Sequence, residues 1–94
     1  MNNKAIGVVE LRGFSNALMA LNYLSDACNY ELIAFERRLG GQLVTVVFQG
    51  ELSGIQEAIE GLKNYGMLGD SLKDAFSLGN PHPQLMRLFQ MGGK

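Results

Sequence analysis

The chain has 94 residues, enough for one domain and too few for a second hydrophobic core. Hydrophobic residues make up 47% and charged residues 18%, as in ordinary globular domains, and the formal net charge of −1 leaves no basic footprint for nucleic acid. The longest apolar runs, such as LVTVVF, are too short to span a bilayer, which argues against a membrane partner.

The redox setting follows from the single cysteine. Cys28 has no partner within the chain, so neither a disulfide nor a cysteine metal cage can form there. The opening residues, MNNKAIGVVE, contain no apolar signal core with a cleavage site, so we expect no export and a reducing, cytoplasmic setting. The 12 glycines and the low charge suggest tight turns and faces that are buried between subunits.

The first half of the chain begins with a buried strand at residues 5–11, a mostly apolar run with β-branched side chains. Gly13 breaks this run, and Ser15 is the expected N-cap of an amphipathic helix. The apolar side of that helix recurs at three- and four-residue steps and consists of Phe14, Ala17, Leu18, Leu21, Leu24 or Ser25, and Cys28. Its other face is expected to carry Met19, Asn22, Tyr23 and Asp26.

Two further strands are predicted at residues 30–36 and 42–50, with a turn at Gly40-Gly41 between them. A second amphipathic helix follows, and Gly66 is placed to stop it. The apolar positions of this helix are Leu52, Ile55, Ala58, Ile59 and Leu62. Its polar positions, expected to face away from the core, are Gln56, Glu57, Glu60 and Lys63.

The last strand is predicted at residues 71–79, with Leu72, Phe76 and Leu78 on one side. An NPHP turn and a short helix at residues 83–91 follow it. The order β-α-β-β-α-β predicts an α+β, ferredoxin-like antiparallel sheet with two helices on one face, plus the short C-terminal helix. We expect a single domain over residues 1–90 and a flexible tail at residues 91–94.

No catalytic constellation stands out, so we predict that the protein is not an enzyme and uses no cofactor. His82 is the lone histidine, with no second metal ligand or nucleophile near it in the sequence, so no metal site is predicted. Cys28 lies on the apolar stripe of the first helix, where thiols act as small hydrophobes. The RLGGQ segment lacks P-loop spacing and leads into a strand rather than a helix.

Three collinear segments resemble the bacterial microcompartment shell proteins of the single-domain, hexamer-forming kind. These segments are AIGVVELRGFSNALMALNYL, NYELIAFERRLGGQLVTVVFQGELSGIQEAI and SLGNPHPQLMRLF. They are similar to the family's opening strand and helix, its central strands with the second helix, and its closing strand with a Pro-His turn. The resemblance extends from Ala5 to Leu88, with one extra residue near Arg37 and Arg38.

The resemblance implies a structural shell protein in the bacterial cytoplasm. Six copies would form a flat disc, and the turn between the second and third strands would line a pore on its axis. The implied pore-lining residues are Arg38, Leu39, Gly40, Gly41 and Gln42. The implied pore passes small anionic or polar metabolites. Glycines let six backbones approach an axis, and a ring of Arg37 and Arg38 would favour the anionic ones.

At the implied edge between hexamers, two cationic residues usual in the family are missing. Asp26 stands where the family has lysine, and Asn80 stands where it has arginine, beside His82. Facing Asp26 carboxylates would repel each other, so we expect tiling to need other shell proteins as partners, and encapsulated enzymes are further possible partners.

Other interpretations remain open from the residues alone. Gly40-Gly41 is also an ordinary hairpin turn with solubilising arginines beside it. A small regulatory module that binds a ligand on a ferredoxin-like sheet would show a pocket at the strand ends and no central hole. A small dimeric enzyme would need His82 as a general base in a concave site.

Overall fold

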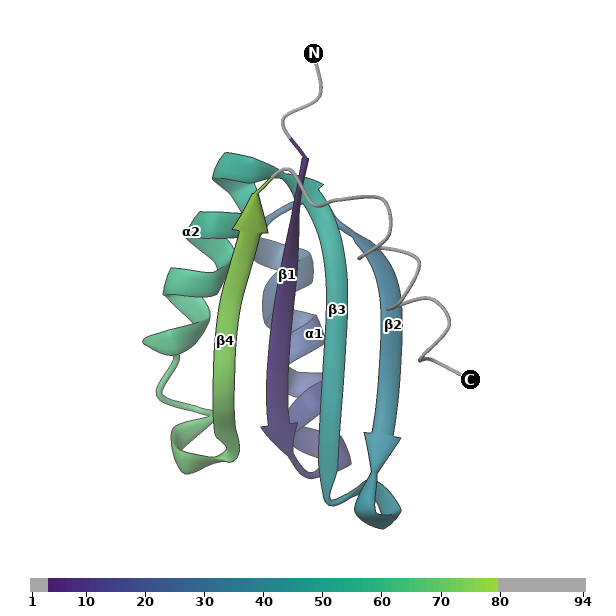
Figure 1. Cartoon of the computed structure of the whole chain (residues 1–94). Helices are drawn as coiled ribbons and strands as arrows, with labels where there is room; N and C mark the ends of the chain where they lie inside the picture. The colour runs from purple at the N-terminus through teal and green to yellow at the C-terminus, as the bar shows by residue number, and fades with distance from the viewer. Residues whose placement is uncertain (1–3, 80–94) are drawn as a thin grey trace.

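The computed structural model describes residues 4–79, which form a four-stranded sheet and two helices (Figure 1). In chain order the elements are β1 (Lys4–Arg12), α1 (Phe14–Ala27), β2 (Glu31–Arg38), β3 (Leu43–Glu51), α2 (Leu52–Lys63) and β4 (Leu72–Gly79). Single 3-10 turns cover Leu39–Gly41 and Gly69–Ser71. The helix expected at residues 83–91 and the tail expected at residues 91–94 lie outside the described residues.

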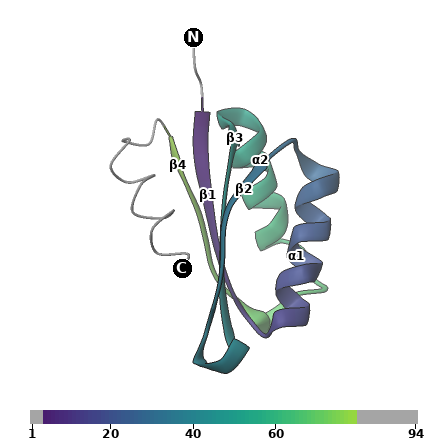
Figure 2. The same cartoon turned by 90° about the vertical axis from the view of Figure 1, so that its right-hand side faces the viewer.

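The strand order is β2-β3-β1-β4, and every neighbouring pair is antiparallel. This is the predicted ferredoxin-like order, in which each helix connects two strands that are separated by a third. Both helices cover the same face of the sheet (Figure 2). Helix α1 packs over β1 and β3, and α2 packs over β1 and β4, so α1 flanks the β2 edge and α2 flanks the β4 edge.

The main core lies between the sheet and the helices. Alternate residues of the central strands point into it, among them Val9, Val46 and Phe48, all fully buried. Burying one such side chain contributes about 1.5–3 kcal/mol. Phe48 pairs with Gly7 across β1 and β3, and a Cβ at Gly7 would overlap its ring, so the glycine makes room for the aromatic side chain.

Helix α1 departs from the prediction at its start. It begins at Phe14 with Gly13 as N-cap, and Ser15 is therefore not the cap. Gly13 has φ 91°, a left-handed conformation that favours glycine, and its N–H donates to the Gln42 carbonyl at 2.9 Å. The exposed start is held instead by Asn16, whose Nδ2 donates to the Arg12 carbonyl at 2.9 Å.

The core-facing side of α1 is also rotated from the predicted stripe. The buried residues are Ala17, Ala20 and Leu24, and Leu18 is 46% exposed. Met19 and Tyr23, predicted on the outer face, pack against the core. Two small alanines let this helix approach its neighbours closely, which turns the larger Leu18 outward; hydrophobicity alone could not rank the alanines above the leucine.

Helix α2 follows the prediction more closely. Its buried residues are Ile55, Ala58, Ile59 and Leu62, and the four predicted polar residues are exposed. The helix ends at Lys63 rather than continuing to Gly66, so the predicted stop signal was wrong. Asn64 caps the end of the helix. Its backbone N–H donates to the Gly61 carbonyl, and its Nδ2 donates to the Glu60 carbonyl at 3.0 Å.

A register shift in the β1–β4 pair overturns the predicted face of β4. The shift lies between Glu10 and Leu11, so Leu72 pairs with Leu11 and packs against the main core. Phe76 pairs with Val8 on the opposite face, which carries a second apolar cluster of Ile6, Val8 and Val47. Leu78 pairs with Ile6 on that same face, so Leu72 and the other two apolar residues lie on opposite sides of the sheet.

Candidate pore loop

The candidate site is the loop between β2 and β3, which extends beyond the end of the sheet (Figure 1). The strands remain paired up to Arg38 and Leu43, so four residues form the connection. Three successive residues are left-handed, with φ 54° at Leu39, 67° at Gly40 and 91° at Gly41. The Gln42 N–H closes the turn by donating to the Leu39 carbonyl at 3.3 Å.

Gly40 and Gly41 are required by the backbone conformation of the loop, and not because a side chain there would collide with neighbouring atoms. A Cβ built at Gly40 or Gly41 would meet nothing within 4 Å. The tip is therefore open to approach by another molecule, and its position is set from behind by the Gly13 to Gln42 hydrogen bond. This bond joins the loop to the β1–α1 junction, a connection for which the sequence carried no signal except Gly13 itself.

Leu39 is the unusual residue of the loop. It is 73% exposed, the largest value among the exposed large hydrophobic residues of the described chain. It is also the one non-glycine residue with positive φ among residues 4–79, a conformation that costs a leucine about 1–2 kcal/mol. Within the single chain, neither the exposure of this apolar side chain nor its disfavoured backbone conformation is offset by packing in the core.

The two arginines beside the loop are both engaged by neighbours. Arg38 donates to Glu36 Oε1 from Nη2 at 2.8 Å and from Nε at 3.2 Å. The Arg37 guanidinium carbon lies 5.2 Å from the centroid of the Phe14 ring, in cation–π geometry. Glu36 therefore neutralises part of the positive charge that was predicted at the mouth of the pore. Sequence reasoning missed this residue, although the two-residue strand period puts it on the same face as Arg38.

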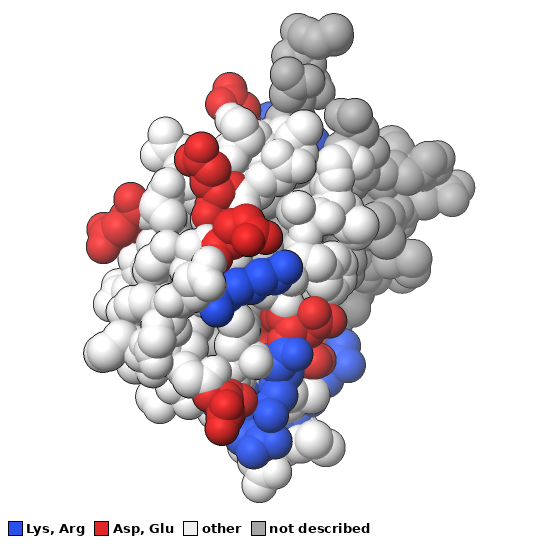
Figure 3. All heavy atoms as spheres, turned by 90° about the vertical axis from the view of Figure 1, so that its left-hand side faces the viewer, with Lys and Arg blue, Asp and Glu red and all other residues white. Residues whose placement is uncertain are grey.

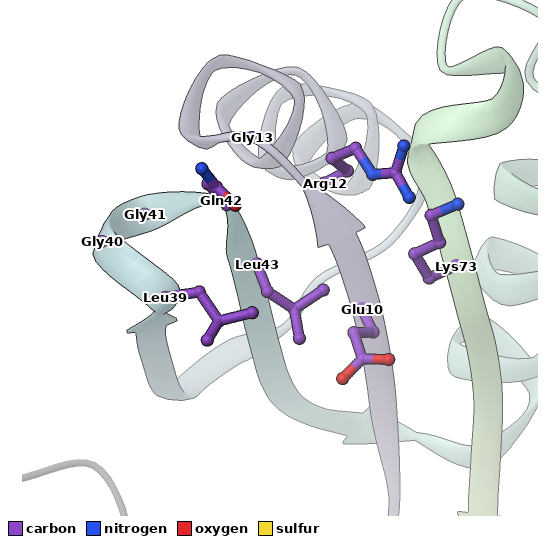
Figure 4. Close-up of a pocket in the computed structure, with 9 residues that line it drawn as sticks. All are labelled: Glu10, Arg12, Gly13, Leu39, Gly40, Gly41, Gln42, Leu43 and Lys73. Atoms are coloured by element: carbon purple, nitrogen blue, oxygen red, sulfur yellow. The ribbon is translucent and has the colours of Figure 1, made fainter.

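A shallow depression of about 730 Å³ adjoins the loop, and its lining includes Glu10, Arg12 and Lys73. In Figure 4 the Arg12 and Lys73 side chains extend toward each other, and Leu39 extends toward Leu43. Among the described residues, neither Arg12 nor Lys73 forms an ion pair. On the α2–β4 side of the molecule, acidic side chains predominate in the upper part of the view, and Lys and Arg side chains alternate with acidic ones in the lower part (Figure 3). Sequence reasoning assigned none of the three residues Glu10, Arg12 and Lys73 to the site.

The predicted edge residue Asp26 lies far from the loop. It is exposed in the last turn of α1, about 18 Å along the helix axis from Phe14 at a rise of 1.5 Å per residue. The other two predicted edge residues, Asn80 and His82, lie outside the described residues. The structure therefore places Asp26 and the loop at separate positions of the domain.

The remaining chemistry in the described part of the chain is sparse. Cys28 is half-buried, and burial raises the pKa of its thiol, which disfavours the reactive thiolate. Residues 4–79 contain no group of three or more His, Cys, Asp or Glu side chains that could hold a metal ion. No helix in this range has the length and apolar character needed to cross a membrane.

Apolar side chains are exposed on both flanks of the molecule. On the β2 flank, Phe14 and Leu18 are one helical turn apart on α1, and the Phe14 ring contacts Phe35 of β2 at a centroid distance of 5.7 Å. Elsewhere, Met67 between α2 and β4 is 68% exposed, and Phe76 of β4 is exposed on the sheet face that the helices leave uncovered. Exposed apolar side chains therefore occur at two separate places on the domain, and each place is a candidate contact surface.

Comparisons with known proteins identify a family. The sequence model of the BMC domain matches residues 5–81. Carboxysome shell protein CsoS1A of Hydrogenovibrio crunogenus is 30% identical over 91 residues, which cover 96% of this chain and 94% of that protein. Bacterial microcompartment shell protein PduA of Citrobacter freundii is 24% identical over 92 residues, which cover 98% of each.

Two solved structures share the fold. A microcompartment protein from Desulfitobacterium hafniense DCB superposes with a TM-score of 0.78 at 23% identity, over 96% of this chain and 48% of that one. This chain thus spans about half the length of that protein. The divalent ion tolerance protein CutA1 from Ehrlichia chaffeensis superposes with a TM-score of 0.53 at 10% identity, over 100% and 98% of the two chains. At these identities the likenesses confirm the predicted fold and nothing beyond it.

Proposed function

Since this chain belongs to the BMC domain family, we propose that six copies form a flat ring in a microcompartment shell, with the Leu39–Gln42 loops around a central pore. The ring is a structural tile of the shell within the bacterial cytoplasm, and its pore passes small anionic or polar metabolites. Relatives named as shell proteins support a structural rather than a catalytic role.

The observation that carries the proposal is the apolar surface on both flanks of the molecule. A closed ring needs two different, complementary surfaces on each subunit, because neighbours meet head to tail. The β2 flank offers Phe14 and Leu18, and the β4 side offers Met67 of the α2–β4 connection, with Phe76 exposed on the neighbouring sheet face. Packing one flank of each copy against the other flank of the next would bury both.

The loop is suited to a position near a shared axis. It stands at one end of the molecule, and no atom lies within 4 Å of a Cβ built at Gly40 or Gly41, so loops of neighbouring copies have space to converge. The hydrogen bond from Gly13 to Gln42 holds each loop against its own subunit. A ring of tethered loops gives an opening of defined size rather than a set of mobile tails.

At the outer edge, we propose that this protein meets a different shell protein. Asp26 is exposed in the last turn of α1, and a second Asp26 across a two-fold edge would repel it. A neighbour that carries lysine at this contact would pair with the carboxylate instead. Enzymes enclosed by the shell are a further class of partner.

Native mass spectrometry of the full chain tests the ring. The expected dominant species has six times the 10.3 kDa mass of the chain. A dominant monomer or dimer would contradict the proposal. A trimer that is stabilised by a small ligand would favour a regulatory module instead.

A further inference from the structure

The sheet face opposite the helices carries the second apolar cluster, which is buried although neither α1 nor α2 covers it. Both helices lie on the other face of the sheet (Figure 2). Even so, Ile6 is 0% exposed, Val47 2% and Val8 8%. These three side chains lie on the central strands β1 and β3, and Ile33 and Ala34 of β2 pack beside them. Apolar side chains on a bare sheet face would be open to water, so their burial calls for a covering segment beyond the two helices.

Two stretches of the sequence lie outside the described range. Residues 1–3 include one large apolar side chain, whereas residues 83–91, PQLMRLFQM, include five. At about 100° per residue of an α-helix, four of these five fall on one side. They are Leu85, Met86, Leu88 and Phe89. Arg87 and Gln90 fall on the opposite side, so the sequence predicts an amphipathic helix with an apolar side to bury.

The end of β4 and the width of the sheet match this segment to the cluster. β4 ends at Gly79, which pairs with Ala5, the neighbour of Ile6 in β1. The link from β4 to the predicted helix, residues 80–82, extends over about 10 Å at most. A helix of nine residues is about 14 Å long, and four strands about 4.8 Å apart span about the same distance. A helix that starts beside β4 can therefore cross to β2 and cover both central strands.

We propose that residues 83–91 dock as an amphipathic helix on the sheet face opposite α1 and α2, with their apolar side on the second apolar cluster. The short link keeps this segment at a high effective concentration near the face, which favours it over a separate molecule with similar apolar surface. Docking leaves Arg87 and Gln90 toward solvent, so a shell partner that approaches this side meets polar groups rather than the cluster. The arrangement does not depend on the ring proposed above.

The test uses thiols at two adjacent positions on opposite faces of β3. Val47 belongs to the second apolar cluster and Val46 to the main core. Val47→Cys and Val46→Cys are each made in the full chain with Cys28→Ser, which removes the natural free thiol, and the rate of labelling by iodoacetamide is measured. Phe89→Asp puts a charge on the apolar side of the segment, and Gln90→Asp puts the same charge on its opposite side as control. We expect Phe89→Asp to label the Val47→Cys thiol about tenfold faster or more, with the Val46→Cys thiol and the control unchanged.

Each outcome supports or overturns the docking. If the Val47→Cys thiol labels as fast as in the unfolded chain without any change at Phe89, the face is open and the proposal is wrong. If Phe89→Asp leaves this thiol slow, the cover is not residues 83–91. If its protection is lost on dilution, a second copy supplies the cover, which also contradicts docking within one chain. If Phe89→Asp exposes both thiols, the whole fold has opened, and the milder Phe89→Ala decides: a rise in the ratio of the Val47→Cys rate to the Val46→Cys rate supports the proposal, and an unchanged ratio overturns it.

Discussion

The backbone N–H of Gly13 donates a 2.9 Å hydrogen bond to the carbonyl of Gln42, and this bond joins the start of α1 to the glycine loop. The two residues are 29 positions apart in the sequence, by the difference of their numbers. Gly13 can make this bond because its φ of 91° turns the chain sharply between β1 and α1. The loop's position thus depends on a residue outside it.

Replacing Gly13 should destabilise the fold and loosen the loop. In Gly13→Ala, the positive φ would cost about 1–2 kcal/mol of the free energy of unfolding. Urea denaturation measures this cost, and amide exchange at Gly13 reports the bond to Gln42. Gly66→Ala is the matched control, because Gly66 has no positive φ and a Cβ there meets nothing within 4 Å. Equal stability of the two variants would refute the role assigned to Gly13.

The crossing of the two helices depends on Gly61. A Cβ there would overlap the hydroxyl of Tyr23, whose ring stacks on Tyr65 at a centroid distance of 4.8 Å. Gly54 lies on the same helix, and a Cβ there would make an ordinary 3.5 Å contact with Cys28. We expect Gly61→Ala to be less stable than Gly54→Ala by about 1–2 kcal/mol, since overpacking opposes the gain in helix propensity. Thermal denaturation of the two variants makes the comparison.

The β2 flank can be tested without disturbing the core. Leu18 is 46% exposed, so Leu18→Lys should change the free energy of unfolding of one chain by no more than about 0.5 kcal/mol. Within a ring the same lysine would be buried without a partner and should abolish the sixfold species in native mass spectrometry. Gln56→Lys adds the same charge on the exposed side of α2 and serves as control. A sixfold species that survives Leu18→Lys would exclude this flank as the subunit contact.

The ion pair beside the loop should control the charge of the pore mouth. Glu36→Gln leaves Arg38 uncompensated, and we expect glycerate efflux from assembled shells to rise by up to about tenfold relative to glycerol. The gain should disappear at high salt, which screens exposed charges. Folding stability should change by less than about 1 kcal/mol, because exposed ion pairs contribute little. Glu57→Gln removes the same charge from the exposed face of α2, and an equal effect there would rule out a local one.

Tiling should respond to the charge at the edge. Electron microscopy of the purified wild type is expected to show separate rings, because Asp26 carboxylates that faced each other across the proposed edge would repel each other. Asp26→Lys should give extended sheets, because it removes the repulsion and supplies one of the two cations that the resemblance implies at this edge. Asp26→Asn removes the repulsion without supplying a cation, so it should give smaller patches. Extended wild-type sheets at neutral pH would overturn the proposed need for a different neighbour.

Local patterns in the sequence were sufficient for the order and type of the elements. Apolar and β-branched runs bounded by glycine identified the strands, and the apolar spacing of α2 identified its buried face, because these patterns reflect how a single element meets the core. The Gly40-Gly41 pair located the turn, since few other residues adopt its backbone conformation. The prediction of function came from the resemblance to shell proteins, which the family match to residues 5–81 confirms.

Contacts between distant segments were decided only by the tertiary structure. The alanines of α1 displaced Leu18 from the core, and the register shift after Glu10 put Leu72 and Phe76 on opposite faces. The bond from Gly13 to Gln42 likewise joins two turns that no local pattern connects. Each outcome depends on how closely two surfaces approach, and that distance is set jointly by both surfaces rather than by the residues of either segment alone.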